Sequence, residues 1–130
     1  MPKSPTEKAL QLLRAHGWHA EIVERWVKYP GRPGYRQDLL NVADILAFRP
    51  SVGCPTLAVQ VTAAGSDGER VKKLLAEPRA ALLLRCGWRI EVWGMRKSPV
   101  NGSGLKARTL LWDDGEMRVA EGSLALEASA

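Results

Sequence analysis

The stretches VADILAF (Val42–Phe48) and TLAVQVT (Thr56–Thr62) decide the fold, because each is a short apolar run typical of a buried strand. The connecting residues 49–55 are rich in proline and glycine, which predicts that the two runs pair as neighbouring strands. Each run holds one polar residue that is costly to bury alone, Asp44 in the first and Gln60 in the second. Either each side chain has an ordinary hydrogen-bond partner, or the two form one site.

Together with these two runs, the sequence predicts helices and strands in the order helix, three strands, two helices, strand and a final hairpin. The helices are expected at 4–16, 63–76 and 78–86, the outer strands at 18–29 and 88–95, and the hairpin around Asp114 and Gly115. Loops are expected at 30–37 and 96–108, and a disordered tail at 122–130. We therefore predict a single α/β domain over residues 1–121, with a central mixed β-sheet flanked by helices.

Local signals support this assignment. Ser4 is expected to cap the first helix, and Ser66 with Glu69 forms an S-x-x-E capping box for the second. Four tryptophans fall in strand patterns and are expected in the core, at positions 18, 26, 88 and 93. Trp112 could face a partner.

Composition narrows the class of function. A net charge of +5 and a pI of about 9.6 favour a polyanionic partner, although solubility explains such a charge equally well. No apolar run approaches the ~20 residues of a membrane span, and no signal-peptide pattern opens the chain. We therefore expect a cytoplasmic protein with no membrane partner. Cys54 and Cys86 lack metal-site spacing and are expected to be reduced thiols.

Asp44 and Gln60 can converge if they lie on paired strands. Side chains alternate along a strand, so Gln60 and Thr62 are expected to share one face. A carboxylate, an amide oxygen and the backbone carbonyl of Val61 are hard oxygen ligands, which suit Mg²⁺ or Mn²⁺. Asp38 could enter the same metal site or cap a turn before the strand.

The segments RQDLLNVADILAF, LAVQVT, ERVKKLL and AALLLRCGWRIEVWGM together resemble the PD-(D/E)XK nuclease superfamily. Within it, the chain is most similar to archaeal- and phage-type Holliday junction resolvases, from about Glu7 to Met95. The resemblance implies a restriction-endonuclease-like fold and a metal-dependent, structure-selective DNA endonuclease that acts as a homodimer on four-way junctions. One alternative is a nuclease-like fold with lost or weak catalysis that only binds branched or duplex nucleic acid. Another is a basic interaction module with no nucleic-acid role.

The resemblance also assigns residues to a metal site. Glu7 matches the acid of the first helix, Asp44 the strand aspartate and Gln60 the second acid. Three positions depart from the motif, since Ala43 replaces its proline, Gln60 its second acid and Thr62 its lysine. By this resemblance, Glu7 orients a metal-bound water and Asp44 is the chief ligand.

The missing lysine could come from the following helix. Lys73 and Arg70 are surface neighbours there, so Lys73 is expected to stabilise the attacked phosphate, with Lys72 as an alternative. A solvated helix face with a Glu69–Lys73 pair is the other interpretation. Glu21 and Glu24 are interpreted as exposed residues of the first strand, although one of them could approach the metal.

Cations in the expected loops are candidate DNA contacts. Mobile cationic side chains suit phosphate binding, and no base-reading pattern accompanies them. The candidates are Arg32, Arg36, Arg96, Lys97 and Lys106.

Overall fold

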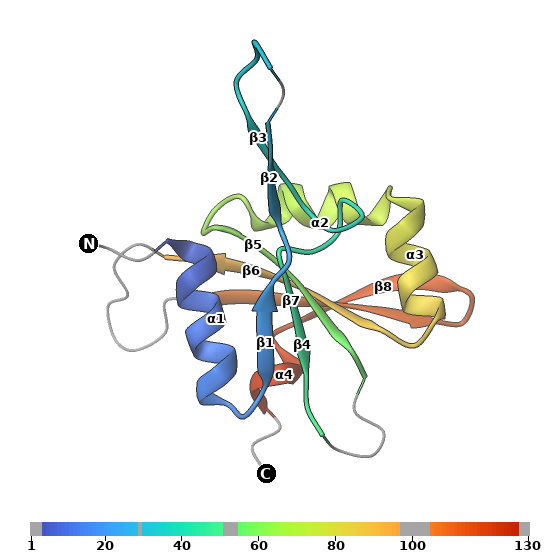
Figure 1. Cartoon of the computed structure of the whole chain (residues 1–130). Helices are drawn as coiled ribbons and strands as arrows, with labels where there is room; N and C mark the ends of the chain where they lie inside the picture. Colours follow the sequence, from blue (N-terminus) through green and yellow to red (C-terminus); the bar gives the residue numbers. More distant parts are fainter. Residues whose placement is uncertain (1–3, 29, 51–54, 97–104, 128–130) are drawn as a thin grey trace.

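A computed structural model describes residues 4–28, 30–50, 55–96 and 105–127, and a six-stranded mixed sheet lies at its centre (Figure 1). In spatial order the strands are β1 (His19–Ile22), β4 (Ile45–Phe48), β5 (Leu57–Ala63), β6 (Arg89–Met95), β7 (Leu105–Asp113) and β8 (Glu116–Glu121). β5 and β6 pair in parallel, and the other neighbours pair antiparallel. The parallel pair requires a crossover connection, which two helices provide.

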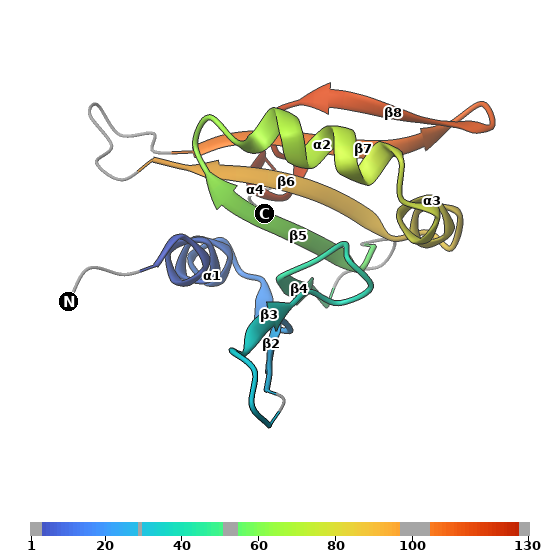
Figure 2. The same cartoon turned by 90° about the horizontal axis from the view of Figure 1, so that it is seen from above.

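Helices cover both faces of the sheet (Figure 2). α1 (Pro5–Ala15) and α4 (Leu124–Glu127) pack on one face, and α2 (Asp67–Leu75) and α3 (Pro78–Arg85) pack on the other. The alternation of side chains divides β5 between these two cores: Val59 belongs to the α1 side and Ala58 to the other. The predicted single α/β domain with a mixed sheet flanked by helices is confirmed.

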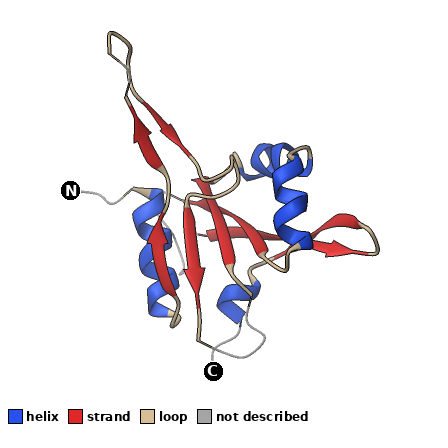
Figure 3. Ribbon diagram, turned by 45° about the vertical axis from the view of Figure 1, so that its right-hand side comes forward, coloured by secondary structure: helices blue, strands red, loops and turns tan. Residues whose placement is uncertain are grey.

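β2 (Arg25–Val27) and β3 (Tyr35–Gln37) form a separate two-stranded hairpin that projects from the sheet (Figures 1 and 3). The predicted loop over 30–37 holds only for residues 30–34, because residues 35–37 form β3. The predicted single strand over 18–29 is wrong, because it is interrupted between β1 and β2. The cause is a β-bulge after β1. The N–H groups of Val23 and Glu24 both donate to the carbonyl of Asp44, at 2.8 and 3.3 Å, so two residues oppose one. A bulge bends its strand and ends regular pairing.

The C-terminal part also differs from the prediction. β7 begins at Leu105, so the expected loop 96–108 is a strand over its last residues, while 97–104 lie outside the described residues. The expected disordered tail contains α4, whose Ala125 is fully buried. Residues 128–130 lie outside the described residues.

Glu91 explains why α4 packs against the sheet. This residue of β6 is 0 % exposed, and its Oε1 accepts hydrogen bonds from Trp93 Nε1 (2.8 Å) and Ser123 Oγ (2.6 Å). Its Oε2 accepts from the backbone N–H of Ala125 at 3.1 Å. The carbonyl of Ala125 in turn accepts from Trp18 Nε1 at 3.1 Å. Buried polar groups are thereby satisfied across the sheet and the C-terminal helix.

The local signals have mixed outcomes. Ser4 Oγ accepts from the N–H of Glu7 at 3.1 Å, which confirms the predicted cap of α1. Ser66 occupies the N-cap position of α2 but makes no side-chain capping bond, so the predicted capping box is wrong. Among the tryptophans at 18, 26, 88 and 93, only Trp26 contradicts the core prediction, because it is 62 % exposed.

None of the helices in the described part of the chain is long and apolar enough to cross a membrane.

Replacing Glu91 with alanine is expected to lower the free energy of unfolding by about 3 kcal/mol, because buried N–H groups of Trp93 and Ala125 lose their acceptor. Urea unfolding followed by circular dichroism measures this change. Glu116→Ala removes an exposed carboxylate of β8 and is the matched control, with an expected change below about 0.5 kcal/mol. Equal effects of the two substitutions would contradict the anchoring role of Glu91.

Candidate functional site

The candidate site lies where β4 and β5 separate. Their backbone pairing reaches Ile45 opposite Val59, and the N–H of Asp44 still donates to the carbonyl of Val59 at 2.9 Å. Beyond this point no strand pairs with this edge of β5, and the carboxylate of Asp44 accepts the hydrogen bond that a paired strand would accept. Its Oδ2 accepts from the N–H of Val61 at 2.7 Å and from Nε2 of Gln60 at 3.0 Å. The two polar residues of the apolar runs therefore converge, as predicted.

A tight turn brings Asp38 beside Asp44. Leu39 and Ala43 form an antiparallel bridge between these two acids. The turn inside the bridge has φ values of 54° at Leu40 and 58° at Asn41, which is the left-handed backbone of a type I′ turn. Asp38 is half-buried and enters the site, which was one of its two predicted positions.

Glu24 is the third acid of the site. One carboxylate oxygen each from Glu24, Asp38 and Asp44 lies within 4.8 Å of the others. An exposed position was expected for Glu21 and Glu24, with the alternative that one of them approaches the metal site, and Glu24 takes that alternative position at the bulge of Val23 and Glu24. Bulges commonly re-aim a side chain in this way beside functional sites.

Glu7 is not part of this cluster, although the family resemblance placed it there. It is exposed on α1, and it does not line the pocket. The residues at the start of α1 that line the pocket are the N-cap residue Ser4 and the helix residues Pro5 and Thr6. The rotation of α1 thus brings Thr6 rather than Glu7 to the pocket, and the third acid of the site is Glu24.

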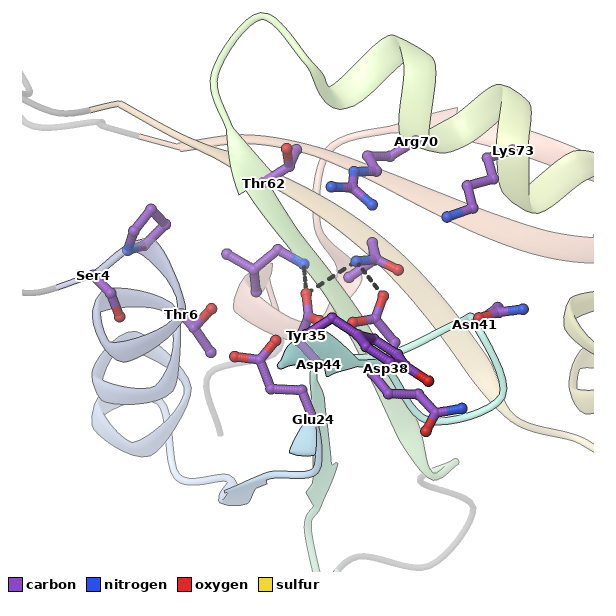
Figure 4. Close-up of a pocket in the computed structure, with 14 residues that line it drawn as sticks. Ser4, Thr6, Glu24, Tyr35, Asp38, Asn41, Asp44, Thr62, Arg70 and Lys73 are labelled. Atoms are coloured by element: carbon purple, nitrogen blue, oxygen red, sulfur yellow. Dashed lines mark hydrogen bonds between the residues drawn. The ribbon is translucent and has the colours of Figure 1, made fainter. Parts of the chain in front are cut away.

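A pocket of about 470 Å³ opens over the acids, and the predicted cations Arg70 and Lys73 also line it (Figure 4). Arg70 and Lys73 extend from α2 toward the acids, and Thr62 lies on β5 between them and α1. Lys72, the alternative to Lys73, is exposed and does not line the pocket. Cationic side chains on one wall therefore face carboxylates on the other.

Gln60 presents its amide nitrogen to the acids rather than the oxygen that was predicted as a ligand. Nε2 donates to Oδ2 of Asp38 at 3.1 Å as well as to Asp44, so Gln60 ties two carboxylates together. Val61 directs its N–H to Asp44. Because the N–H and C=O of one strand residue point to the same edge, its carbonyl faces the same side, as the predicted ligand role requires.

The surroundings of Asp44 favour its protonated form. Asp44 is 3 % exposed, and burial is the largest cause that raises its pKa, from 3.8 to about 8. A hydrogen bond to Asp38 and the negative charges of Asp38 and Glu24 raise the pKa further, while the N–H of Val61 lowers it. A cation at the cluster would act in the opposite direction and favour the ionised form.

The donor set is compatible with Mg²⁺ or Mn²⁺. Both ions prefer carboxylate and carbonyl oxygens, which Asp38, Asp44 and Glu24 supply together with the carbonyl of Val61. A buried carboxylate that stays protonated without a cation is a further sign that positive charge is favoured there.

Of the candidate DNA contacts whose side chains the structure describes, Arg96 and Lys106 lie at the paired ends of β6 and β7, whereas Arg32 lies on the hairpin. Arg32 and Arg96 are exposed, on the hairpin and after β6. Lys106 lies in β7, where its Nζ is 3.9 Å from Oδ2 of the buried Asp67. Arg36 lies in β3, and its side chain is outside the described part. Lys97 lies outside the described residues.

The free energy of unfolding is expected to fall between about pH 4 and pH 8 in metal-free buffer, at up to about 1.4 kcal/mol per pH unit from Asp44. The sign follows because native Asp44 retains a proton up to about pH 8, whereas the unfolded carboxyl releases it near 3.8. Asp44→Asn mimics the protonated form and is expected to lose this part of the pH dependence.

Urea unfolding of both proteins across this pH range, in the presence of EDTA, measures the difference. Titrating groups distant from Asp44 contribute equally to the two proteins, so the difference between the curves isolates Asp44 and the neighbouring Asp38 and Glu24. Parallel curves for the two proteins would contradict the assigned environment of Asp44.

Comparison of the chain with protein-family models, with curated proteins and with solved structures finds no match to any of them.

Proposed function

We propose that the chain is a metal-dependent, structure-selective DNA endonuclease that hydrolyses phosphodiester bonds. The observation that carries this proposal is a pocket with Glu24, Asp38 and Asp44 on one side and Arg70 and Lys73 on the other. Such a pocket suits a divalent cation next to a phosphate, since carboxylates hold the cation and guanidinium and ammonium groups bind phosphate oxygens.

Each residue has a distinct role in this chemistry. Asp44 and Asp38 would hold the metal, with Glu24 and the carbonyl of Val61 completing the site. Gln60 fixes the spacing of the two aspartates through its amide. A bound divalent ion would lower the pKa of an attacking water and neutralise charge on the phosphate. Arg70 and Lys73 would orient the phosphate and stabilise the negative charge of the transition state.

Branched DNA is the proposed substrate class, with a four-way junction as the leading candidate. Apart from the hairpin strands β2 and β3, the elements follow the order α1, β1, β4, β5, α2, α3 and β6. The resemblance to Holliday junction resolvases rests on the order helix, three strands, two helices and strand as much as on the motifs. A restriction-endonuclease-like fold belongs to the same proposal. Cutting two symmetric strands of a junction requires two active sites, so we propose a two-fold homodimer.

A second function, DNA binding without cleavage, has its own supporting observation. Nε2 of Gln60 already donates to both aspartates, which gives the acids a partner that is not a metal. Gln60 and Thr62 also stand where the resemblance implies an acid and a lysine. In this alternative Asp44 serves the fold rather than a reaction.

Cleavage of labelled four-way junction, flap and duplex DNA with Mg²⁺ or Mn²⁺ tests the two functions. Wild type is expected to nick the junction in symmetric pairs, and Asp44→Ala to lower the rate at least about a hundredfold. Lys73→Ala is expected to slow cleavage about ten- to a hundredfold, because a cation facing the phosphate is lost.

Lys72→Ala removes the same charge from the neighbouring position outside the pocket, and its rate is expected to stay within about twofold of wild type. Wild type that cuts none of the three substrates with either metal would contradict the enzyme proposal. If such a protein still retains junction DNA, and Asp44→Ala does so with equal affinity, the binding-only function stands.

A further inference from the structure

The β2–β3 hairpin carries an aromatic surface that the proposed chemistry does not use. Trp26 of β2 is 62 % exposed. A Cβ added to Gly34 would overlap the indole at Nε1, Cε2 and Cζ2, so the ring packs directly on the backbone of the opposite arm of the hairpin. One side of the indole is thereby supported, and the other side is open to solvent.

The same hairpin carries only positive charge. Residues 25–37 contain no aspartate or glutamate, and their cationic residues are Arg25, Lys28, Arg32 and Arg36. Arg25 is held across the hairpin, since its Nη2 donates to Oε1 of Gln37 at 3.2 Å. An exposed tryptophan among cations fits a ligand that joins planar apolar groups to a chain of negative charges.

The hairpin projects from the sheet (Figure 3), and residues at its two ends line the acidic pocket. Glu24 comes directly before β2 and Asp38 directly after β3, so both ends of the hairpin are acids of the cluster. Tyr35 and Gln37 of β3 line the pocket. A ligand bound along the hairpin would therefore extend to the carboxylates.

We propose that the hairpin binds DNA through an unpaired base that stacks on Trp26, while its cations contact the flanking phosphates. A base inside a duplex is stacked on both sides and offers no face to the indole, whereas an unpaired base at a branch point or in a single strand does. The support from Gly34 holds the ring in place before binding, which lowers the entropic cost of stacking. This inference rests on the proposed function and names the feature by which the chain would select branched over intact duplex DNA.

Fluorescence anisotropy in EDTA tests the stacking contact without cleavage. The probes are labelled 15-nucleotide oligo-dT, an abasic oligonucleotide of the same length, and a 15-base-pair duplex. Trp26→Ala is expected to weaken oligo-dT binding about tenfold and binding of the other two probes by less than about twofold. Trp112→Ala removes an exposed tryptophan of β7, at the other side of the sheet, and is expected to leave all three affinities unchanged.

Two further variants separate stacking from charge. Gly34→Ala displaces the indole without removing it, so it is expected to weaken oligo-dT binding and to leave abasic binding unchanged. Arg32→Ala is expected to weaken binding of both oligonucleotides and to lower the salt slope of log K by about 0.7. Circular dichroism establishes that each variant is folded.

Unchanged oligo-dT affinity of Trp26→Ala would overturn the inference, and so would an equal loss on the abasic probe. Trp26-dependent binding to phosphatidylserine vesicles, with no binding of oligo-dT, would overturn it in favour of a membrane surface. These outcomes are independent of the proposed function. If wild type cuts junctions but Trp26→Ala binds oligo-dT normally, only the stacking inference is contradicted. If wild type cuts nothing but oligo-dT binding depends on Trp26, only the proposed catalysis is contradicted.

Discussion

The site depends on one hydrogen bond, from the backbone N–H of Val61 to the carboxylate of Asp44 at 2.7 Å. This bond satisfies a donor of β5 that no strand reaches once β4 has separated from it. The backbone of Asp44 also pairs on both sides, since its N–H donates to Val59 and its carbonyl accepts from Val23 and Glu24. One residue therefore fixes the separation of β4 from β5 and the bulge that turns the chain from β1 into the hairpin.

The same arrangement concentrates negative charge in a poorly hydrated place. Burial and the neighbouring Asp38 and Glu24 raise the pKa of Asp44 to about 8, so the acids favour any ligand that supplies positive charge. Arg70 and Lys73 face the cluster from α2 across the pocket. Under the proposed function, the site lowers the stability of the metal-free fold at neutral pH in exchange for a place where a metal ion and a phosphate could bind.

Strand alternation is sufficient to predict the centre of the site. It places Gln60 on a single face of β5, and the structure brings that face to Asp44. Glu24 could not be predicted in the same way, because its orientation depends on a bulge formed against the carbonyl of a residue distant in sequence. The prediction that Glu7 belongs to the site is wrong for a simpler reason, because the rotation of α1 brings Thr6 to the pocket instead.

The remaining differences come from contacts between distant segments. The pattern around Trp26 correctly indicates a strand, but that strand belongs to a two-stranded hairpin outside the main sheet, with no core to cover it. α4 looks like a polar tail in sequence, and its position depends on the bonds from Ser123 and Ala125 to Glu91. Local propensity does not report such partners.

Titration calorimetry with Mn²⁺ at pH 7, in two buffers of different ionisation enthalpy, tests the account most directly. A pKa of about 8 at Asp44 means that an ion must displace a proton, so close to one proton is expected to be released for each ion bound. Asp44→Asn is expected to bind no ion. Saturable binding without proton release, or wild type that binds no ion, would contradict the assignment of Asp44 as the centre of a metal site.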